Sequence, residues 1–556
     1  MYFMESTLRK PSLLEALLPI IFLVAILATN VWVFGDDSLS GANQMALLVS
    51  AAVAGLIGMR LGYKWDHMQN GIVSSITSAL SAILILLLIG SLAGTWLLSG
   101  IVPAMIYYGL EVLNPTIFLF AACFVSAVVS LATGSSWSTI ATIGIALLGI
   151  GKALGMSEGL VAGAIISGAY FGDKMSPLSD TTNLAPAMAG TDLFTHIRYM
   201  LWTTVPPITI TLIIFLVIGL VNSSEGSVDN VVAVQTAIQE KYTITGWLFL
   251  VPLAVIVMIV RKVPALPALL VGTLLGGLFA LFFQGNIISE IGDTYFINEQ
   301  VATEIQAQVA DEGLKADAAA LAGDVVIGSE SFAATISPYI TNHEQVTAIA
   351  ASAKSSGFSA FVAILKAMYG DIAITTNDSI VNDLLSTSGM SGMLNTIWLI
   401  VCAMVFGGVM ESIGLLQRIT EAVISWATST GSLVASTALT CIGFNLTASD
   451  QYLAIVVPGR MFADTYRKRG LMPQNLSRTL EDSGTVTSVL VPWNTCGATQ
   501  SSVLGVATIM YLPYCFFNLI SPVMTVAYAY FNIKIARYNN DATPEPEQEA
   551  VAHVQA

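Results

Sequence analysis

The chain has 556 residues, of which 55% are hydrophobic and only 10% are charged, and its formal net charge is −15. Soluble domains carry about 25% charged residues, so this composition excludes an ordinary soluble protein. The acidic balance also excludes the basic surface of a nucleic-acid-binding protein. The sequence contains no nucleotide-binding or zinc-peptidase motif, so we expect no enzymatic activity.

Apolar runs long enough to cross a bilayer recur along the chain, since about 20 apolar residues suffice. The first run, 13–34, is longer than the core of a removable signal peptide and lacks a small-residue cleavage site, so we interpret it as a membrane helix. The pattern predicts an all-α polytopic membrane protein with about 10–12 transmembrane segments. Clear examples are 13–34, 201–221, 244–260, 264–283, 394–410 and 503–531.

Lysine and arginine positions indicate the orientation. Arg9 and Lys10 precede the first run, whereas Asp36 and Asp37 follow it. Basic residues favour the cytoplasmic side, so both termini are expected in the cytoplasm of a bacterial cell, with the chain in its inner membrane. The other basic residues expected on that side are Arg60, Lys64, Arg261, Lys262, Arg418, Arg467, Lys468, Arg469, Lys534 and Arg537.

Residues 285–390 interrupt the apolar pattern and carry many more acidic than basic side chains. The preceding run begins beside two basic residues, so this insert is expected outside the cytoplasm. A solvated cap and a module that binds a ligand or partner are both open interpretations. The predicted division is a first membrane half at 1–284, the acidic insert, a second membrane half at 391–538, and an acidic cytoplasmic tail at 539–556.

Polar motifs recur at matching positions in the two membrane halves. The motif TGSS at 133–136 resembles TASD at 447–450, and a proline follows each motif at nearly the same spacing, Pro177 and Pro492. Matching interruptions of apolar segments indicate an internal repeat with broken helices, which is typical of transporters. The number of crossings does not settle whether the two halves have opposite orientations.

These interruptions gather oxygen atoms inside the membrane. Irregular backbone survives there only where it is buried in protein or lines a wet cavity, and several oxygen ligands suit a small hard cation such as Na⁺. Carbonyl groups at the ends of half-helices add negative charge. The predicted cation-binding residues are Thr133, Ser135, Ser136, Ser179, Asp180, Thr181, Thr182 and Asn183 in one site, and Thr447, Ser449, Asp450, Asn494 and Thr495 in another.

Each predicted site holds one carboxylate, Asp180 or Asp450. A charged side chain within the membrane costs at least ~2.5 kcal/mol and is a candidate functional group. Burial favours the protonated form and a bound cation favours the ionised form, so such a group can hold either Na⁺ or H⁺. A structural anchor at a helix break is the alternative. Asp173 and Lys174 are expected to form a local charge pair or part of a gate.

Three stretches carry a resemblance to a known family. They are GAIISGAYFGDKMSPLSDTTNLAPAMAGTDLFTHIRYM at 163–200, GGVMESIGLL, and EDSGTVTSVLVPWNTCGATQSSVLG at 481–505. Together they resemble the NhaC-type sodium/proton antiporters of the ion-transporter superfamily. The likeness covers nearly all of the membrane portion, but it does not extend to the insert at 285–390.

The resemblance implies an inverted repeat with two helical hairpins and two broken helices. It also implies that Na⁺ binds between the hairpin tips at 179–183 and 494–495 and the unwound segments at 133–136 and 447–450. Relatives in the superfamily often form homodimers in the lipid bilayer. The expected function is exchange of Na⁺ for H⁺, with no cofactor beyond the transported ion. The alternative is Na⁺- or H⁺-coupled transport or exchange of an amino acid or small carboxylate.

Overall fold

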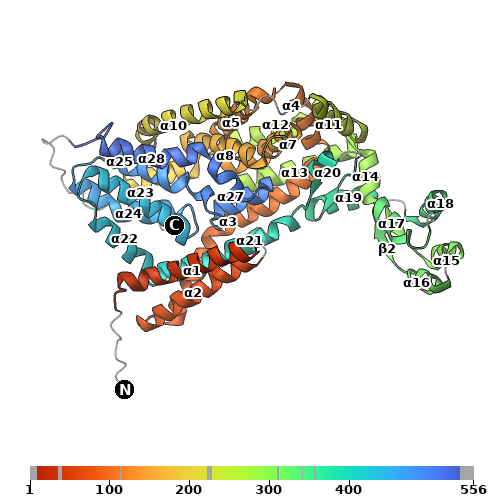
Figure 1. The fold of residues 1–556 in the computed structure, drawn as a ribbon, viewed down its shortest axis with the longest axis horizontal. Helices are drawn as coiled ribbons and strands as arrows, with labels where there is room; N and C mark the ends of the chain where they lie inside the picture. Colours follow the sequence, from red (N-terminus) through yellow and green to blue (C-terminus); the bar gives the residue numbers. More distant parts are fainter. Residues whose placement is uncertain are drawn as a thin grey trace, which may run out of the picture.

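The computed structural model describes residues 9–34, 41–112, 114–221, 228–309, 312–340, 342–355, 358–376 and 379–538. These residues form a long body of helices, and a small lobe projects from one end of it (Figure 1). The expected acidic tail at 539–556 lies outside the described residues.

Eight helices of the described chain are long and apolar enough to span a membrane, and two bent pairs raise the number to ten. The expected range of 10–12 is therefore reached only at its lower end, because helix breaks divide several apolar runs. The bent pairs are Val231–Lys241 with Gly246–Val260, at 92°, and Thr508–Tyr514 with Phe516–Tyr530, at 56°. The eight helices are α1 (Leu13–Phe34), α2 (Ala42–Arg60), α3 (Trp65–Leu98), α5 (Pro115–Thr133), the run Ser136–Ala153, α10 (Leu193–Val221), α13 (Ala265–Phe283) and Ser391–Ser412, which contains α21 (Leu394–Ser412).

Large apolar side chains cover the outside of the body. On α10, Trp202, Ile213 and Val217 are each about half exposed, and on α13 the side chain of Phe282 is 73% exposed. Such broad apolar surfaces are rare on soluble monomers. The described chain is therefore a multi-span membrane protein whose outer helices face lipid.

The two membrane halves contain the same order of elements. In each, a helix ends, the chain breaks, a second and a third helix follow, and a second break precedes a short fourth helix. In the first half these are α5, the run α6 (Ser136–Thr139) to α7 (Ile145–Ala153) through a π-helical turn, α8 (Glu158–Met175) and α9 (Asp180–Ala189). In the second half they are α23 (Thr430–Thr447), α24 (Leu453–Lys468), α25 (Pro473–Leu480) with the turns Glu481–Thr485 and Ser488–Leu490, and α26 (Thr495–Leu504).

Helix α8 packs unusually closely on α5. A Cβ atom at Gly168 would overlap the carbonyl oxygen of Cys123, and one at Gly172 would overlap that of Ala127. Small residues allow membrane helices to approach to backbone contact. This contact fixes the C-terminal end of α8 beside the break that follows α5.

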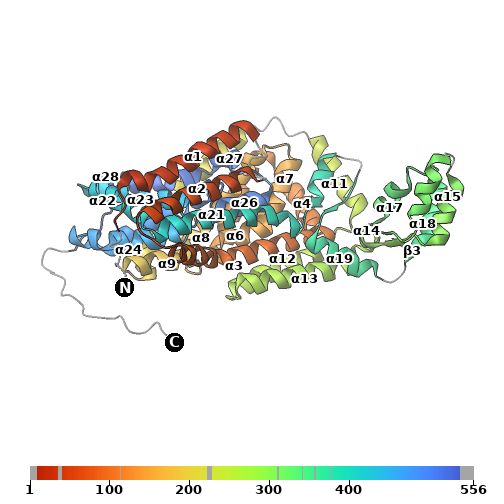
Figure 2. The ribbon, with the colours of Figure 1, turned by 90° about the horizontal axis from the view of Figure 1, so that it is seen from below.

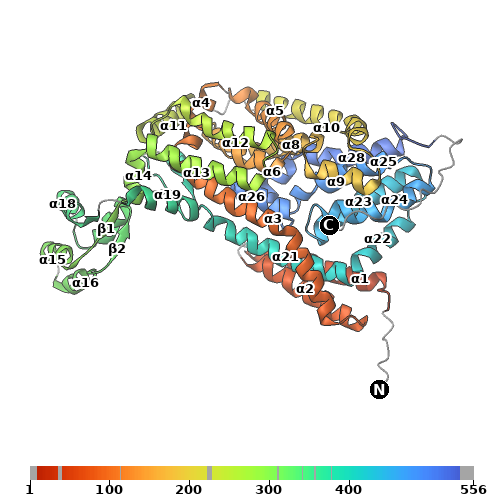
Figure 3. The ribbon, with the colours of Figure 1, turned by 180° about the vertical axis from the view of Figure 1, so that it is seen from behind.

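The remaining helices frame the repeated elements. Figure 3 shows α1, α2 and α21 beside α3 on one flank, with α5, α8 and α10 on the other. Figure 2 shows α9 and α24 at the end of the body opposite the lobe. The framing elements are α4 (Ile101–Val112), α11 (Val228–Lys241), α12 (Leu250–Val260), α22 (Leu415–Ser425), α27 (Thr508–Tyr511) and α28 (Phe516–Tyr530).

Only the middle of the 285–390 segment forms the lobe. Its sheet has β1 (Thr294–Phe296) between β2 (Val325–Ile327) and β3 (Lys354–Ser355), all antiparallel, and a separate core includes Tyr295 and Phe332. The flanking helix α19 (Ser359–Tyr369) packs against α3 and α13 instead. The other elements are α14 (Gly285–Gly292), α15 (Glu299–Gln308), α16 (Lys315–Ala320), α17 (Ser329–Ile336), α18 (His343–Ala353), β4 (Ile372–Ala373), α20 (Ser379–Leu384) and β5 (Ser386–Thr387).

Candidate functional site

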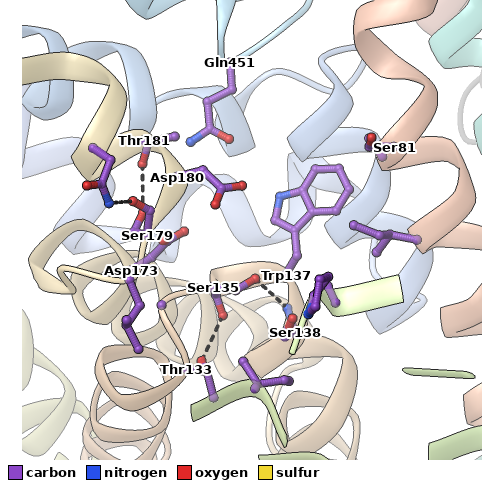
Figure 4. A pocket seen from close by; sticks show the side chains of 18 of the residues that line it. Ser81, Thr133, Ser135, Trp137, Ser138, Asp173, Ser179, Asp180, Thr181 and Gln451 are labelled. Carbon is purple, nitrogen blue, oxygen red and sulfur yellow. Dashed lines mark hydrogen bonds between the residues drawn. The ribbon is translucent and has the colours of Figure 1, made fainter. Parts of the chain in front are cut away.

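A cavity of about 650 Å³ lies where the four helix breaks meet. Both membrane halves contribute to its wall, so the two predicted cation sites belong to one cavity. Figure 4 shows part of this wall, with the side chains of Asp180 and Gln451 near each other and Ser81 on a separate helix. The predicted residues that line it are Thr133, Ser135, Ser179, Asp180, Thr181, Asn183, Asp450 and Thr495, together with Asp173.

The first-half break depends on a glycine. Gly134 has φ 71°, a left-handed conformation that glycine adopts without strain, and a Cβ atom there would lie 2.6 Å from the Cβ of Leu178. The hydroxyl of Ser135 then accepts the N–H of Ser138 at 3.1 Å and caps the N-terminus of α6. The break after α5 and the tip between α8 and α9 are therefore in direct contact.

The second-half break makes the equivalent contact with its own tip. Ser449 has φ 60°, which is strained for a residue with a side chain, and its carbonyl accepts the N–H of Thr495 at 3.0 Å. Asn494 caps α26 by accepting the N–H of Cys496 at 3.0 Å. A backbone hydrogen bond thus replaces the glycine contact of the first half.

Helix ends of both signs face the cavity region. Helices α5, α8 and α23 end at these breaks, whereas α6, α9, α24 and α26 begin there. The C-terminal ends carry partial negative charge and favour a cation, while the N-terminal ends carry partial positive charge and favour an anion. The site can therefore stabilise a small cation and a carboxylate close together.

Two of the three carboxylates in the wall are held by helix N-termini. Asp450 accepts the N–H of Leu453 at 3.0 Å, at the start of α24. Asp173, from α8, accepts the N–H and the hydroxyl of Ser136 at 3.1 and 2.7 Å. Both side chains are buried. Each therefore helps to fix a broken helix in place, whatever else it binds.

Asp180 has a different environment. It is exposed to the cavity, and the hydroxyl of Tyr452 donates to its Oδ2 at 3.1 Å. No lysine, arginine or histidine of the described chain forms an ion pair with it. Asp180 is thus the carboxylate of the wall most available to a cation from solution.

Five predicted residues do not line the cavity. Their hydrogen bonds go to the backbone or, for Ser136, also to the carboxylate of Asp173. Thr182 donates to the carbonyls of Asp173 and Lys174, and Thr447 donates to the carbonyl of Gly443. The other three are Ser136, Ser449 and Asn494, whose contacts are described above.

Of the two interpretations of Asp173 and Lys174, the local charge pair is wrong, and a part in a gate stays a prediction. Neighbouring residues on a helix point to different faces, and Lys174 turns away from the cavity to form a fully buried ion pair with Asp482. Its ammonium also donates to Ser521 at 3.1 Å. Lys174 therefore joins the hairpins of the two halves, and only Asp173 reaches the cavity.

Several wall residues were not predicted from the sequence. Trp137, Gln451 and Tyr452 directly follow the two polar motifs, so their position next to a break was an available signal. In the view of Figure 4, the Trp137 ring lies between Asp180 and Ser81. Ser78 and Ser81 come from helix α3, and Lys262 comes from the turn between α12 and α13. No local pattern in the sequence connects these three residues with the polar motifs.

The wall is not a conventional transition-metal site. Within the described chain, no group of three or more histidine, cysteine, aspartate or glutamate side chains is placed to hold a metal ion. The carboxylates are spread among hydroxyl, amide and carbonyl oxygens. Such a mixed oxygen wall suits a weakly held hard cation that must enter and leave.

Comparison with known proteins identifies the family of this chain. The model of the Na⁺/H⁺ antiporter family matches residues 168–312 and 295–533. The match includes the insert at 285–390, so the expectation that the likeness stops there is wrong. The chain is 33% identical over 515 residues to the Na⁺/H⁺ antiporter NhaC of Alkalihalophilus pseudofirmus, covering 93% of this chain and 95% of that protein. It is 32% identical over 542 residues to the malate-2H⁺/Na⁺-lactate antiporter of Bacillus subtilis, covering 97% and 99%.

One further relative and one solved structure are also similar to this chain. The chain is 32% identical over 547 residues to the arginine/ornithine antiporter ArcD of Halobacterium salinarum, covering 98% of this chain and 96% of that protein. A solved structure of MtrF from Neisseria gonorrhoeae covers 94% and 96% at 12% identity, with a TM-score of 0.28, too low a score to support an argument. The antiporter relatives are secondary transporters and not enzymes, and this chain belongs to the Na⁺/H⁺ antiporter (NhaC) family.

Proposed function

We propose that this protein exchanges Na⁺ for H⁺ across the cytoplasmic membrane, with Asp180 as the group that holds either ion. The observation that carries the proposal is that Asp180 faces an oxygen-lined cavity without a cationic partner in the described chain. Asp450 lies in the same wall and supplies a second carboxylate.

The exchange follows from competition at one carboxylate. An ionised Asp180 attracts Na⁺, and hydroxyl and carbonyl oxygens of the breaks replace part of the ion's hydration shell. A protonated Asp180 is neutral and loses that attraction, so proton binding releases Na⁺. Because the two ions exclude each other, a gradient of either one drives the other in the opposite direction.

The architecture that we propose for this exchange is an inverted repeat. The two halves, 1–284 and 391–538, supply the hairpins α8–α9 and α25–α26 and the broken helices, with the insert 285–390 outside the cytoplasm and both termini inside. The homodimer implied by the resemblance belongs to the same proposal, and cross-linking in native membranes tests it.

The proposed exchange is tested with Asp180→Asn in inverted membrane vesicles that contain a pH-sensitive fluorescent dye. We expect the variant to lose Na⁺-induced dequenching, because an amide binds neither a proton nor a cation as a carboxylate does. Asp464→Asn is the matched control, since Asp464 is 78% exposed on the surface of α24. Undiminished exchange by Asp180→Asn would remove this residue from the mechanism.

A second candidate function is coupled transport of a small amino acid or carboxylate. The cavity is far larger than a Na⁺ ion, and the N-termini of α9 and α26, which bind no carboxylate of the wall, offer positive ends to a substrate carboxylate. The malate/lactate and arginine/ornithine antiporters are relatives of similar identity. Counterflow of labelled organic acids and amino acids in proteoliposomes separates the two functions, because a pure cation exchanger moves none of them.

A further inference from the structure

A second cavity of about 310 Å³ lies further along the body. Its wall is mostly apolar, with side chains such as Ile89, Leu97 and Leu148, and the chain at 386–388 adds hydroxyl groups. Lys152 is the charged residue of this wall, and it pairs with Glu158 at 3.0 Å. None of its lining residues belongs to the wall of the first cavity.

The same three elements line both cavities. Helix α3 supplies Ile85 to the first cavity and Ile89 to the second, and α26 supplies Thr495 to the first and Ser502 to the second. The run from α6 to α7 likewise reaches both cavities. At 1.5 Å per residue, Ile85 and Ile89 lie about 6 Å apart along α3. A single helical turn of α3 therefore separates the two spaces on this side.

The two cavities face opposite ends of the body. The first includes Lys262, which belongs to the basic set expected in the cytoplasm. The second includes Leu384 and Met393, from the chain that returns from the lobe. Figure 2 shows the lobe and α9 at opposite ends of the molecule. With the proposed orientation, the first cavity opens toward the cytoplasm and the second lies toward the outside.

We infer that the second cavity is the extracytoplasmic vestibule of the substrate path, and that the path follows the seam between α3 and the pair formed by α6–α7 and α26. This inference rests on the proposed transport function. In the described conformation, substrate reaches Asp180 from the cytoplasmic side, and the packing around Ile85 and Ile89 closes the seam.

Side-specific labelling tests the position of the two cavities. Ser81→Cys reports on the first cavity and Ser502→Cys on the second, and all five native cysteines are buried. A membrane-impermeant maleimide is applied to spheroplasts or to inverted vesicles. We expect Ser81→Cys to react in inverted vesicles and Ser502→Cys to react in spheroplasts. Labelling of both variants from the same side, or no labelling of Ser502→Cys from outside, overturns the inference.

A filling variant tests whether the vestibule belongs to the path. Ala93 lines the second cavity, so Ala93→Phe should lower exchange at least tenfold while the Na⁺-induced rise in melting temperature stays unchanged, because Na⁺ still enters the first cavity. Ala52→Phe, exposed on α2, is the matched control. Exchange by Ala93→Phe at the wild-type rate would exclude the vestibule from the path.

The two experiments distinguish a failure of this inference from a failure of the proposed Na⁺/H⁺ exchange. If Na⁺ neither raises the melting temperature of the wild-type protein nor drives exchange, the Na⁺/H⁺ proposal fails. The labelling sides still decide whether the seam connects two opposite openings, and an organic substrate found by counterflow then replaces Na⁺ in the assay of Ala93→Phe.

Discussion

The hydroxyl of Tyr452 donates a hydrogen bond of 3.1 Å to the carboxylate of Asp180. The two residues come from different halves of the molecule, since Tyr452 lies in the break between α23 and α24 and Asp180 begins α9. This contact therefore joins the broken helix of one half to the hairpin tip of the other, directly at the cavity. Any movement that separates the two halves must break it.

Tyr452→Phe should weaken Na⁺ binding without abolishing exchange. The phenol donates a hydrogen bond that holds the carboxylate of Asp180 at the cavity wall, so without it the carboxylate is less well placed for Na⁺. We expect the Na⁺ concentration for half-maximal exchange to rise about fivefold, which corresponds to about 1 kcal/mol. The measurement is Na⁺-dependent dequenching in inverted vesicles at fixed pH. Tyr530→Phe, on the exposed surface of α28, is the control, and an unchanged half-maximal concentration for Tyr452→Phe would contradict the assigned contact.

Local features of the sequence predicted the breaks because their causes are local. Gly134 supplies the positive φ, and Ser135, Ser179 and Asn494 are residue types that cap helices. The side of the cavity formed by these motifs was therefore accessible from the sequence. That the two predicted sites form one cavity was not accessible from the sequence, because it depends on how the two halves pack.

Contacts between distant segments escaped prediction for the same reason. Lys174 has an acidic neighbour in sequence, yet its partner Asp482 lies in the other half. Ser81 lies on a long apolar helix with no polar motif around it. The packing of α19 was not predicted either, because this helix lies within 285–390 yet contacts the membrane helices α3 and α13, although it is too short to span.

Gly134→Ala tests the steric reason for the first break. Alanine is strained at φ 71°, and its Cβ would press against Leu178. The left-handed conformation alone costs about 1–2 kcal/mol, so we expect a clearly lower melting temperature and a loss of exchange. Gly443→Ala is the matched control, because a Cβ there meets no atom within 4 Å and alanine favours the helix. Equal melting temperatures for the two variants would show that the break tolerates a side chain.

Lys354→Met should loosen the lobe without affecting transport. Lys354 contacts Asp293 at 2.5 Å, and Asp293 also accepts the hydroxyl of Ser359 at 2.7 Å. This ion pair therefore ties β3 to the root of the lobe. We expect faster proteolytic cleavage within 293–355 and unchanged exchange, because no described residue of the lobe lines the first cavity. Lys366→Met is the control, and loss of exchange in Lys354→Met would give the lobe a direct role.

The same ion pair predicts a dependence on pH. The hydrogen bond to Asp293 raises the pKa of Lys354 above its ordinary value. A group whose pKa is raised on folding stabilises the folded state fully at pH values below its ordinary pKa. This stabilisation is lost as the pH rises through the pKa of the group in the folded state. Cleavage of the wild-type lobe should therefore stay slow from neutral to mildly alkaline pH, and it should accelerate only above the ordinary pKa of lysine. Acceleration already at mildly alkaline pH would contradict this assignment.

The buried ion pair of Lys174 and Asp482 should dominate stability. Both side chains are fully buried, and removal of one partner leaves an unpaired charge, which typically costs about 3–5 kcal/mol. We therefore expect Lys174→Met and Asp482→Leu each to reduce the amount of folded protein in the membrane and the melting temperature strongly. The double variant should recover most of the loss, because no isolated charge remains. Lys152→Met breaks the more exposed pair with Glu158 and should change stability by about 0–1 kcal/mol. If the double variant is as unstable as the single ones, the pair contributes specific contacts to Ser521 and the hairpins beyond charge neutralisation, and the prediction fails.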